Sequence, residues 1–180
     1  FREAEKWSQS IHISTTAQLN KAIQEGKGGD LIRVCEAHQE NQIAKIGDEI
    51  NANADRIKLI LIAGPSSSGK TTFAQRLRIQ LMVNGLNPVP ISMDDYFHNR
   101  DDIPFGENEE RDLESIDIID VELFNEQITA MIQGEEVEMP SYNFQSGKRE
   151  YTGKRVKLSS DQLIIVEGIH ALNEKLTSMI

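Results

Sequence analysis

The stretch that most constrains the fold of this chain is the glycine-rich segment 64–72, with the sequence GPSSSGKTT. Its spacing, G-x-x-x-x-G-K-[ST], is that of a Walker A loop, whose backbone N–H groups surround phosphate oxygens. Residues 57–63 before it are nearly all apolar and β-favouring, as in a strand buried on both faces. Residues 72–84 after it carry apolar residues at helical spacing, and Gly85 is a natural stop. Strand, loop and helix together predict a phosphate site at a helix N-terminus.

Length and composition favour one α/β domain with a small additional segment. The chain has 180 residues, enough for a full core, and a formal net charge of −10, which argues against nucleic acid or an anionic membrane as the main partner. The single Cys35 excludes an internal disulfide, suits a reducing cytosol and is expected to be packed inside. No apolar run reaches membrane-spanning length, so we expect a cytoplasmic protein. The start at Phe1 and the stop at Ile180 suggest a fragment of a longer protein.

The first part of the chain is predicted to be separate from the rest. Residues 1–55 have the composition of a mainly helical segment, and residues 56–180 would form the core domain. We expect a short strand at 11–14, a first helix that begins at a capping box on Thr15, and a second helix capped by Asp30. This segment carries no residues at metal-ligand spacing and no visible chemistry.

Two acidic residues follow a second predicted strand. Residues 86–93 read as a core strand that leads directly into Asp94 and Asp95. In an open parallel sheet, functional groups gather at the carboxyl ends of the strands, where the phosphate loop also lies. A carboxylate there can take the proton of an attacking hydroxyl or can hold Mg²⁺. We expect Asp94 to face the site because it directly follows the strand; the alternative is a solvated acidic turn.

A third predicted strand, residues 162–168, also ends in an acid. Glu167 would occupy the Walker B position, from which a carboxylate orients Mg²⁺ or its water ligands. Before this strand, the acid-rich residues 101–110 are expected to form a solvated, mobile face. Asp120 is expected to cap a helix that Gly134 ends.

Residues 137–158 change the pattern to short strand-like runs, separated by turns at 146–147 and 152–153. Such an excursion fits a parallel core poorly, and it is a good candidate for a flap that covers a substrate. Tyr142 and Phe144 lie at alternate positions beside Arg149, so that the flap offers ring faces and a cation. The alternative is that the two rings fill a minor core under the hairpin.

In this order, the motifs resemble the uridine kinase branch of the phosphoribulokinase and uridine kinase family of P-loop kinases. The resembling segments are GPSSSGKTT, the strand leading to MDDYF, ESIDIIDVELF, GEEVEMPSYNF with GKR, and LIIVEGIHALN. The resemblance implies a three-layer α/β P-loop kinase fold with a parallel sheet core and a small β flap. It also implies phosphorylation of the 5′-hydroxyl of uridine or cytidine by ATP (or GTP) with Mg²⁺, as in pyrimidine salvage.

The resemblance assigns roles to residues at matching positions. It makes Lys70 and Asp94 catalytic, with Lys70 on the β- and γ-phosphates, and it makes Thr71 and Glu167 the Mg²⁺ residues. The nucleotide-binding residues would be Gly64, Ser66, Ser67, Ser68, Gly69, Lys70, Thr71 and Thr72. The acceptor-binding residues would be Asp94, Tyr96, Phe97, Glu114, Tyr142, Phe144 and Arg149.

The chain departs from the family pattern in places that concern the acceptor. Glu114 stands where the family has an acid that grips the ribose hydroxyls, but Ser115 and Ile116 replace the following His-Pro. Gly147 stands where the family has a histidine that reads the pyrimidine edge, which leaves the acceptor open. The family's arginine-bearing lid would lie beyond Ile180. The N-terminal segment resembles the tail of a threonyl-tRNA-synthetase-like module.

Two alternatives to a nucleoside kinase therefore stay open. One is a P-loop kinase of another small-molecule hydroxyl, and the other is a non-catalytic ATP-sensing module. Acids at two strand ends favour an enzyme, and the sequence lacks the N-K-x-D motif of GTPases and the L-S-G-G-Q signature of transporter ATPases. The expected partner is a nucleoside or another small acceptor; a membrane or nucleic acid is not expected, and a homo-oligomer is left open.

Overall fold

The computed structural model describes residues 2–103 and 114–177, so most of the predicted acidic segment 101–110 lies outside the described residues. The chain forms two compact units, Phe1–Ile43 and Ala44–Ile180. The division falls within helix α3 (Gly28–Asn51), and the boundary after residue 55 stays a prediction. Across the described residues, no helix combines the length and the apolarity that a membrane-spanning segment requires.

The first unit is helical, with α1 (Arg2–Ser10), α2 (Thr16–Gln24) and the start of α3. The predicted capping box at Thr15 is confirmed, because the Thr15 side chain accepts from Gln18 N–H and Gln18 accepts from Thr15 N–H. The resemblance of this unit to a synthetase module remains a prediction.

Three expectations for the first unit are wrong. Residues 11–14 form a turn rather than a strand, since the backbone N–H groups of Ile11 and Ile13 donate back to α1. Asp30 does not cap α3, because this helix begins two residues earlier at Gly28 and Asp30 lies in its first turn. Cys35 is exposed on α3 rather than packed inside.

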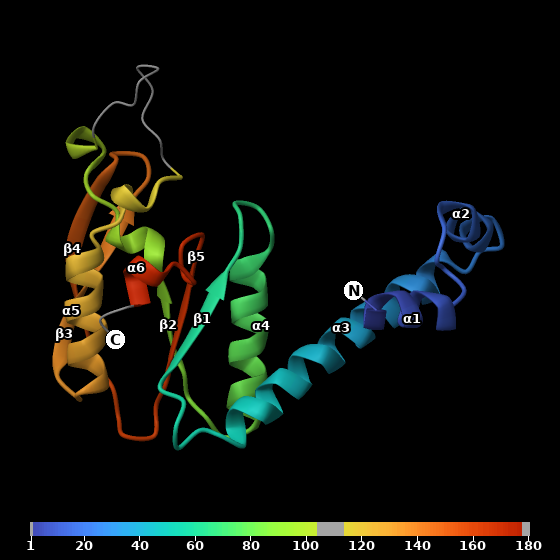
Figure 1. The fold of residues 1–180 in the computed structure, drawn as a ribbon, viewed down its shortest axis with the longest axis horizontal. Helices are drawn as coiled ribbons and strands as arrows, with labels where there is room; N and C mark the ends of the chain where they lie inside the picture. The colour runs from blue at the N-terminus through green and yellow to red at the C-terminus, as the bar shows by residue number, and fades with distance from the viewer. Residues whose placement is uncertain (1, 104–113, 178–180) are drawn as a thin grey trace. The chain divides into compact units, whose positions relative to one another are not determined.

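The second unit is built on a parallel sheet of three strands, β1 (Leu59–Ala63), β2 (Val89–Ser92) and β5 (Ile164–Gly168). Their order is β1-β5-β2, with β5 in the middle (Figure 1). The register pairs Ala63 with Gly168 and Ser92 with Glu167, so the carboxyl ends of all three strands meet at one edge. The predicted α/β class with a parallel sheet core is confirmed.

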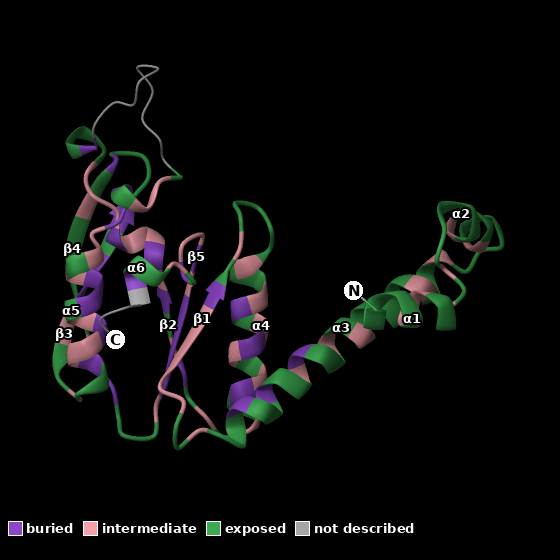
Figure 2. Cartoon of the chain, in the orientation of Figure 1, coloured by how far each residue is buried: buried purple, intermediate pink, exposed green. Residues whose placement is uncertain are grey.

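Helices lie on the two sides of this sheet. On one side, α5 (Val121–Ile132) packs its Phe124, Ile128 and Met131 against Ile164 and Val166 of β5 in one core cluster (Figure 2). On the other side lies α4 (Lys70–Val83), whose inner face shares a cavity with Ile165. Because successive side chains of a strand point to opposite faces, the covered part of β5, Ile164–Val166, has to be apolar on both faces.

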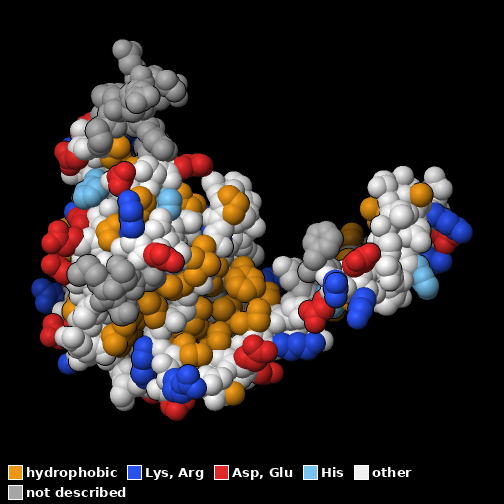
Figure 3. Space-filling view, viewed as in Figure 1, with side chains coloured by type: hydrophobic (Ala, Val, Ile, Leu, Met, Phe, Trp, Pro, Cys, Tyr) orange, Lys and Arg blue, Asp and Glu red, His pale blue; other side chains and the backbone are white. Residues whose placement is uncertain are grey.

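Strand β1 is less buried than the sequence predicts. Leu59, Ile60 and Leu61 are only half-buried, and only Ile62 of this strand is fully buried. The reason is its place in the sheet, since β1 pairs with β5 alone and lies at the edge of the described strands. Figure 3 shows hydrophobic side chains exposed on the viewed face of this unit, in the region between α5 and α4.

A two-stranded antiparallel hairpin joins α5 to β5. It consists of β3 (Glu136–Asn143) and β4 (Lys148–Lys157), and its turn lies at 146–147 as predicted. The second predicted turn at 152–153 is wrong, because β4 continues through it. The register shifts there from Pro140↔Tyr151 to Glu138↔Arg155, and Gly153 has φ +79°, so the extra residues form a bulge.

Short helical turns complete the unit. The one-turn 3₁₀ helices are Met93–Tyr96, Arg100–Asp102 and Ile116–Ile118, and α6 (Glu174–Thr177) follows β5. The predicted N-cap at Asp120 is confirmed, because its side chain accepts from Leu123 N–H at 3.1 Å. Gly85 and Gly134 have positive φ directly after α4 and α5, as the sequence predicts for the two helix ends.

Candidate active site

The phosphate loop leaves the first turn of α4 open to a ligand. Ser67 and Gly69 both have left-handed φ angles, +59° and +88°, and Ser68 N–H turns back to Pro65 O at 3.2 Å. Gly69 is the N-cap of α4, so no side chain covers the first backbone N–H groups of the helix. Uncapped N–H groups at a helix N-terminus, with Lys70 as the first helical residue, form an anion-binding arrangement.

Three oxygen-bearing side chains meet where α4 starts beside the sheet. Glu167 Oε2 accepts a hydrogen bond from Thr71 Oγ1, and its Oε1 accepts from Ser92 Oγ, both at 3.1 Å. The cause lies in the sheet register, because β5 lies between the strand that enters the loop and the strand that carries Ser92. Sequence reasoning missed Ser92, although its place at the end of the second predicted strand was a usable signal.

This oxygen set fits Mg²⁺. The ion takes oxygen ligands and is commonly bound by one or two carboxylates together with substrate phosphates. Within residues 2–103 and 114–177, no three His, Cys, Asp or Glu side chains cluster as metal ligands, so the protein offers one carboxylate and two hydroxyls here. Thr71, Ser92 and Glu167 also line a cavity of about 450 Å³ on the α4 side of the sheet.

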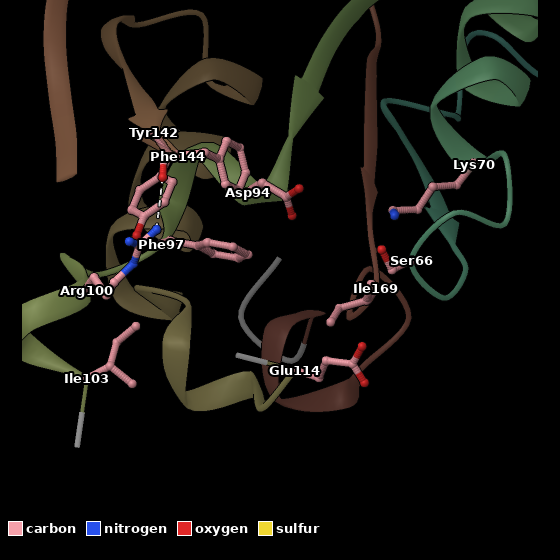
Figure 4. A pocket seen from close by; sticks show the side chains of 10 residues that line it. All are labelled: Ser66, Lys70, Asp94, Phe97, Arg100, Ile103, Glu114, Tyr142, Phe144 and Ile169. Atoms are coloured by element: carbon pink, nitrogen blue, oxygen red, sulfur yellow. Dashed lines mark hydrogen bonds between the residues drawn. The ribbon is translucent and has the colours of Figure 1, made fainter. Parts of the chain in front are cut away.

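A second cavity, of about 270 Å³, opens beside the phosphate loop (Figure 4). In the view, Lys70 and Ser66 lie at one end, Arg100 and Ile103 lie at the other, and Phe97 lies between them. The cavity is lined by Ser66, Lys70, Asp94, Phe97, Arg100, Ile103, Glu114, Tyr142, Phe144 and Ile169. The structure therefore brings together residues from the loop, the end of β2, the hairpin and the segment after β5.

Asp94 is the acid of the pair that lines this cavity, whereas Asp95 turns to the hairpin and accepts from Tyr142 N–H at 3.1 Å. Burial raises the pKa of Asp94, and the nearby Glu167 carboxylate raises it further, while Lys70 opposes both effects. Asp94 therefore lies close enough to Glu167 and to Lys70 for both charges to act on its carboxyl group. Its catalytic role remains a prediction.

Three aromatic rings form one wall of the cavity. Tyr142 lies 5.3 Å from Phe97 and 5.2 Å from Phe144, and both pairs are edge-to-face. Tyr142 is buried, whereas the Phe144 residue is 60% exposed. An exposed ring supported by two buried or half-buried rings offers a rigid surface on which a planar group can stack.

Glu114 also lines the cavity, as the resemblance implies for an acid that contacts the acceptor. His170, for which the sequence showed no role, donates from Nε2 to the backbone carbonyl of Glu114 at 2.7 Å. This bond ties the segment after β5 to the backbone of Glu114. Nothing in the sequence signals it, since the two residues lie far apart along the chain.

Two expected acceptor residues do not line the cavity. Tyr96 is fully buried in the α5-side core, where its hydroxyl donates to Gln127 Oε1 at 3.0 Å and its ring packs edge-to-face on Phe124. Burial also raises the pKa of its hydroxyl. The short 3₁₀ turn after β2 explains the difference, because it sends Asp94 and Phe97 to the cavity and Tyr96 inward.

Arg149 is the second of these residues. Its guanidinium donates to Asp120 Oδ2 at 2.8 Å, and both side chains are about one-fifth exposed. Burial pushes the pKa of Asp120 upward, but hydrogen bonds from Leu123 N–H and Arg149 outweigh it and lower the pKa. Arg149 therefore holds the hairpin to the start of α5. Among the expected nucleotide residues, Ser66 and Lys70 line the smaller cavity and Thr71 lines the larger one. The remaining ones line neither of these two cavities: Gly64, Ser67, Ser68, Gly69 and Thr72.

The model of the Phosphoribulokinase / Uridine kinase family matches residues 59–178, well over half of the chain. The chain belongs to this family. The match begins at β1 and includes every element that contributes to the two cavities. For a member of the phosphoribulokinase / uridine kinase family, use of ATP and Mg²⁺ is the general expectation, and the oxygen set around Glu167 agrees with it.

Curated relatives of the chain include uridine kinases. One from Halobacterium salinarum is 31% identical over 114 residues, which cover 63% of this chain and 48% of that protein. One from Lactobacillus johnsonii is 32% identical over 117 residues, which cover 65% and 54%. The chain thus spans about half the length of these two relatives.

Solved structures share the fold. A structure described as a possible uridine kinase from Bacillus stearothermophilus has a TM-score of 0.57 at 24% identity, covering 74% of this chain and 75% of the other. A putative fructose transport system kinase from Silicibacter sp. TM1040 has a TM-score of 0.59 at 19% identity, covering 76% and 70%. At these identities the likeness shows the P-loop kinase fold and no particular acceptor.

Proposed function

We propose that this protein is an ATP- and Mg²⁺-dependent kinase that transfers a phosphoryl group to the 5′-hydroxyl of a nucleoside. The main support is the convergence of Lys70, Asp94 and the aromatic wall on one cavity. This arrangement fits phosphoryl transfer to an acceptor with a planar group. It places a phosphate-binding cation, a candidate base and a surface for ring stacking in the same cavity. Relatives named uridine kinase support the nucleoside class.

The phosphate loop and its helix would hold the triphosphate. The open N–H groups of the first turn of α4 would donate to phosphate oxygens, and Lys70 would contact the β- and γ-phosphates. Thr71, Ser92 and Glu167 would hold Mg²⁺, which neutralises phosphate charge when it is bound. In this chemistry the protein mainly positions the reactants and offsets charge.

Asp94 would act as the base. As the acceptor oxygen forms its bond to the γ-phosphorus, the bond to the bridging oxygen of the leaving ADP breaks, and the hydroxyl proton passes to the Asp94 carboxylate. Burial and the Glu167 charge raise the pKa of Asp94 and so make its carboxylate a better proton acceptor.

The rest of the cavity would hold the nucleoside. Its base would stack on the wall formed by Phe97, Tyr142 and Phe144, and Glu114 would accept hydrogen bonds from the ribose hydroxyls. A kinase with this acceptor would act in the cytoplasm, in pyrimidine salvage.

The test is a panel of nucleosides and sugar alcohols, each incubated with the intact protein and ATP-Mg²⁺ and assayed for the phosphorylated product. The proposal predicts phosphorylation of at least one pyrimidine nucleoside, and loss of activity in Lys70→Ala. If only a sugar alcohol is phosphorylated, the protein is a kinase of another acceptor. If ATP binds but no acceptor is phosphorylated, the protein is an ATP sensor and the proposal fails.

A further inference from the structure

Arg100 lies at the end of the cavity away from Lys70 (Figure 4), and its side chain packs against Gly147. Arg100 N–H donates to Gly147 O at 2.7 Å, and Arg100 Nη2 donates to Phe144 O at 2.9 Å. The arginine is thus fixed at both its backbone and its guanidinium to the hairpin turn that carries the aromatic wall. Sequence reasoning assigned no role to Arg100.

The position of Arg100 requires glycine at 147. Gly147 has φ +68°, and a Cβ at this residue would lie 2.9 Å from Arg100 Cβ and 3.0 Å from its Nε. The first of these atoms is next to the backbone and cannot swing away as the end of a side chain can. A side chain at 147 and Arg100 in its present place therefore exclude each other.

Among the described residues, the Arg100 guanidinium has more donors than partners. It has five N–H groups and no acceptor, and the described residues take one of them, through Phe144 O. Residues 2–103 and 114–177 contain no carboxylate in a salt bridge with Arg100, unlike Arg149, which is paired with Asp120. Arg100 lines the cavity beside Phe97 and Phe144, so its remaining N–H groups lie next to the surface on which a ring would stack.

We propose that Arg100 selects the acceptor by donating hydrogen bonds to the keto oxygen at position 4 of a uracil ring that stacks on the aromatic wall. The inference rests on the proposed nucleoside kinase function. Uracil presents two carbonyl oxygens, whereas cytosine presents an amino group in place of one of them. A guanidinium cannot accept from that amino group, so the site favours uridine over cytidine. Gly147 contributes by leaving the space that Arg100 occupies.

The experiment compares kcat/KM for uridine and cytidine in the intact protein and in Arg100→Met and Arg100→Lys. Arg100→Met keeps most of the apolar stem but removes the donors, and it should lower kcat/KM for uridine about 10- to 100-fold, the effect of a hydrogen bond from a charged group. The uridine-to-cytidine ratio should fall toward one, and Arg100→Lys should lie between the two. Arg155→Met, which removes an exposed arginine on the same hairpin, is the matched control.

The ratio separates selection from a structural role. A change that merely loosened the hairpin would lower both activities together and leave the ratio unchanged, and this result would overturn the inference while the proposed function stands. Gly147→Ala should displace Arg100 and also lower the ratio; an unchanged ratio in that variant would contradict the inference as well. If the unaltered protein phosphorylates no nucleoside, the proposed function fails, and the role of Arg100 fails with it.

Discussion

Thr71 Oγ1 donates a hydrogen bond of 3.1 Å to Glu167 Oε2, which ties the first turn of α4 to the carboxyl end of β5. The two residues lie far apart in the sequence, and the parallel register brings them together. Ala63, at the entry to the phosphate loop, pairs with Gly168, the residue after Glu167. The loop and the acid are thus placed side by side by the register of the parallel sheet.

This relationship gives the first prediction. Glu167→Gln can still bond to both hydroxyls, accepting from one at its Oε1 and donating to the other from its Nε2, but it removes the charge. It should therefore impair Mg²⁺ binding during turnover far more than it weakens the fold. We expect the Mg²⁺ concentration for half-maximal rate to rise at least about 10-fold, measured by titration of the steady-state rate. Glu126→Gln, an exposed acid on α5, is the control. An unchanged Mg²⁺ requirement in Glu167→Gln would remove this residue from the metal site.

Asp94 gives a prediction on pH. Because burial and Glu167 raise the pKa of Asp94 in the folded protein, the folded state holds this proton more tightly than the unfolded chain. Its stabilising contribution is therefore present at low pH and is lost as pH rises through the raised pKa. Asp94→Asn should increase the free energy of unfolding at pH 7. The gain should shrink as pH falls through the raised pKa of the folded state, and it should be lost by about pH 4, the pKa of an aspartate in the unfolded chain.

The check is urea unfolding of both proteins at several pH values. Asp161→Asn changes an exposed acid in the turn before β5 that lines neither cavity, and it serves as the control. A gain in Asp94→Asn that stayed constant from pH 7 to pH 4 would show that the charge of Asp94 is not its cause. In activity, the acidic limb of the rate profile should have its midpoint above the usual range of an aspartate.

The Arg149–Asp120 ion pair gives a prediction on stability. Arg149→Met leaves Asp120 without its charged donor and should cost about 1–3 kcal/mol of unfolding free energy at pH 7. The pKa of Asp120 is lowered in the folded protein, so its contribution is present above the unfolded pKa and is lost as pH falls through the folded pKa. The cost should accordingly shrink in acid.

The comparison is with Arg155→Met, since Arg155 and Glu136 form an exposed pair on the same hairpin, for which we expect about 0–1 kcal/mol. Chemical denaturation at pH 7 and in acid measures both. Equal costs for the two variants would mean that Arg149 does not anchor the hairpin.

Tyr96 and Phe144 give a paired prediction. Tyr96→Phe removes a buried hydrogen bond to Gln127 and should cost about 1 kcal/mol of stability with no change in KM for the acceptor. Phe144→Ala removes an exposed ring and should leave stability nearly unchanged, but it should raise KM for the acceptor about 10-fold, as expected for a lost stacking contact. A raised KM in Tyr96→Phe, together with an unchanged KM in Phe144→Ala, would contradict this account and place Tyr96 in the acceptor site.

The sequence predicted the parts of the site that depend on local pattern. The loop, the helix that Gly85 ends and the acids at two strand ends each follow from spacing within one segment. Tyr96 was misplaced because the four-residue 3₁₀ turn after β2 decides which side chains face the cavity, and nothing in the residues MDDYF specifies that turn. The sequence predicted a turn at 152–153 because glycine at positive φ is typical of turns. A β-bulge uses the same backbone conformation, and Gly153 has it within β4.

Relationships between distant segments could not be predicted. Ser92 becomes a partner of Glu167 through the order β1-β5-β2, which a strand pattern does not contain. Arg100 reaches the cavity through its bonds to the hairpin turn more than forty residues later, which a reading by segments cannot show. From the sequence, Gly147 indicated only that the family's base-reading histidine is missing. In the structure, Gly147 leaves the space that the Arg100 side chain occupies.

The most direct test of the central claim is the formation of uridine 5′-phosphate from uridine and ATP-Mg²⁺, followed by mass spectrometry in the intact protein and in Asp94→Asn, with ATP binding measured in parallel. If Asp94 is the base of a nucleoside kinase, the product forms in the unaltered protein, and its rate falls about 10²- to 10⁴-fold in Asp94→Asn while ATP still binds. Full product formation in Asp94→Asn, or ATP binding with no phosphorylated nucleoside in the unaltered protein, would contradict the claim.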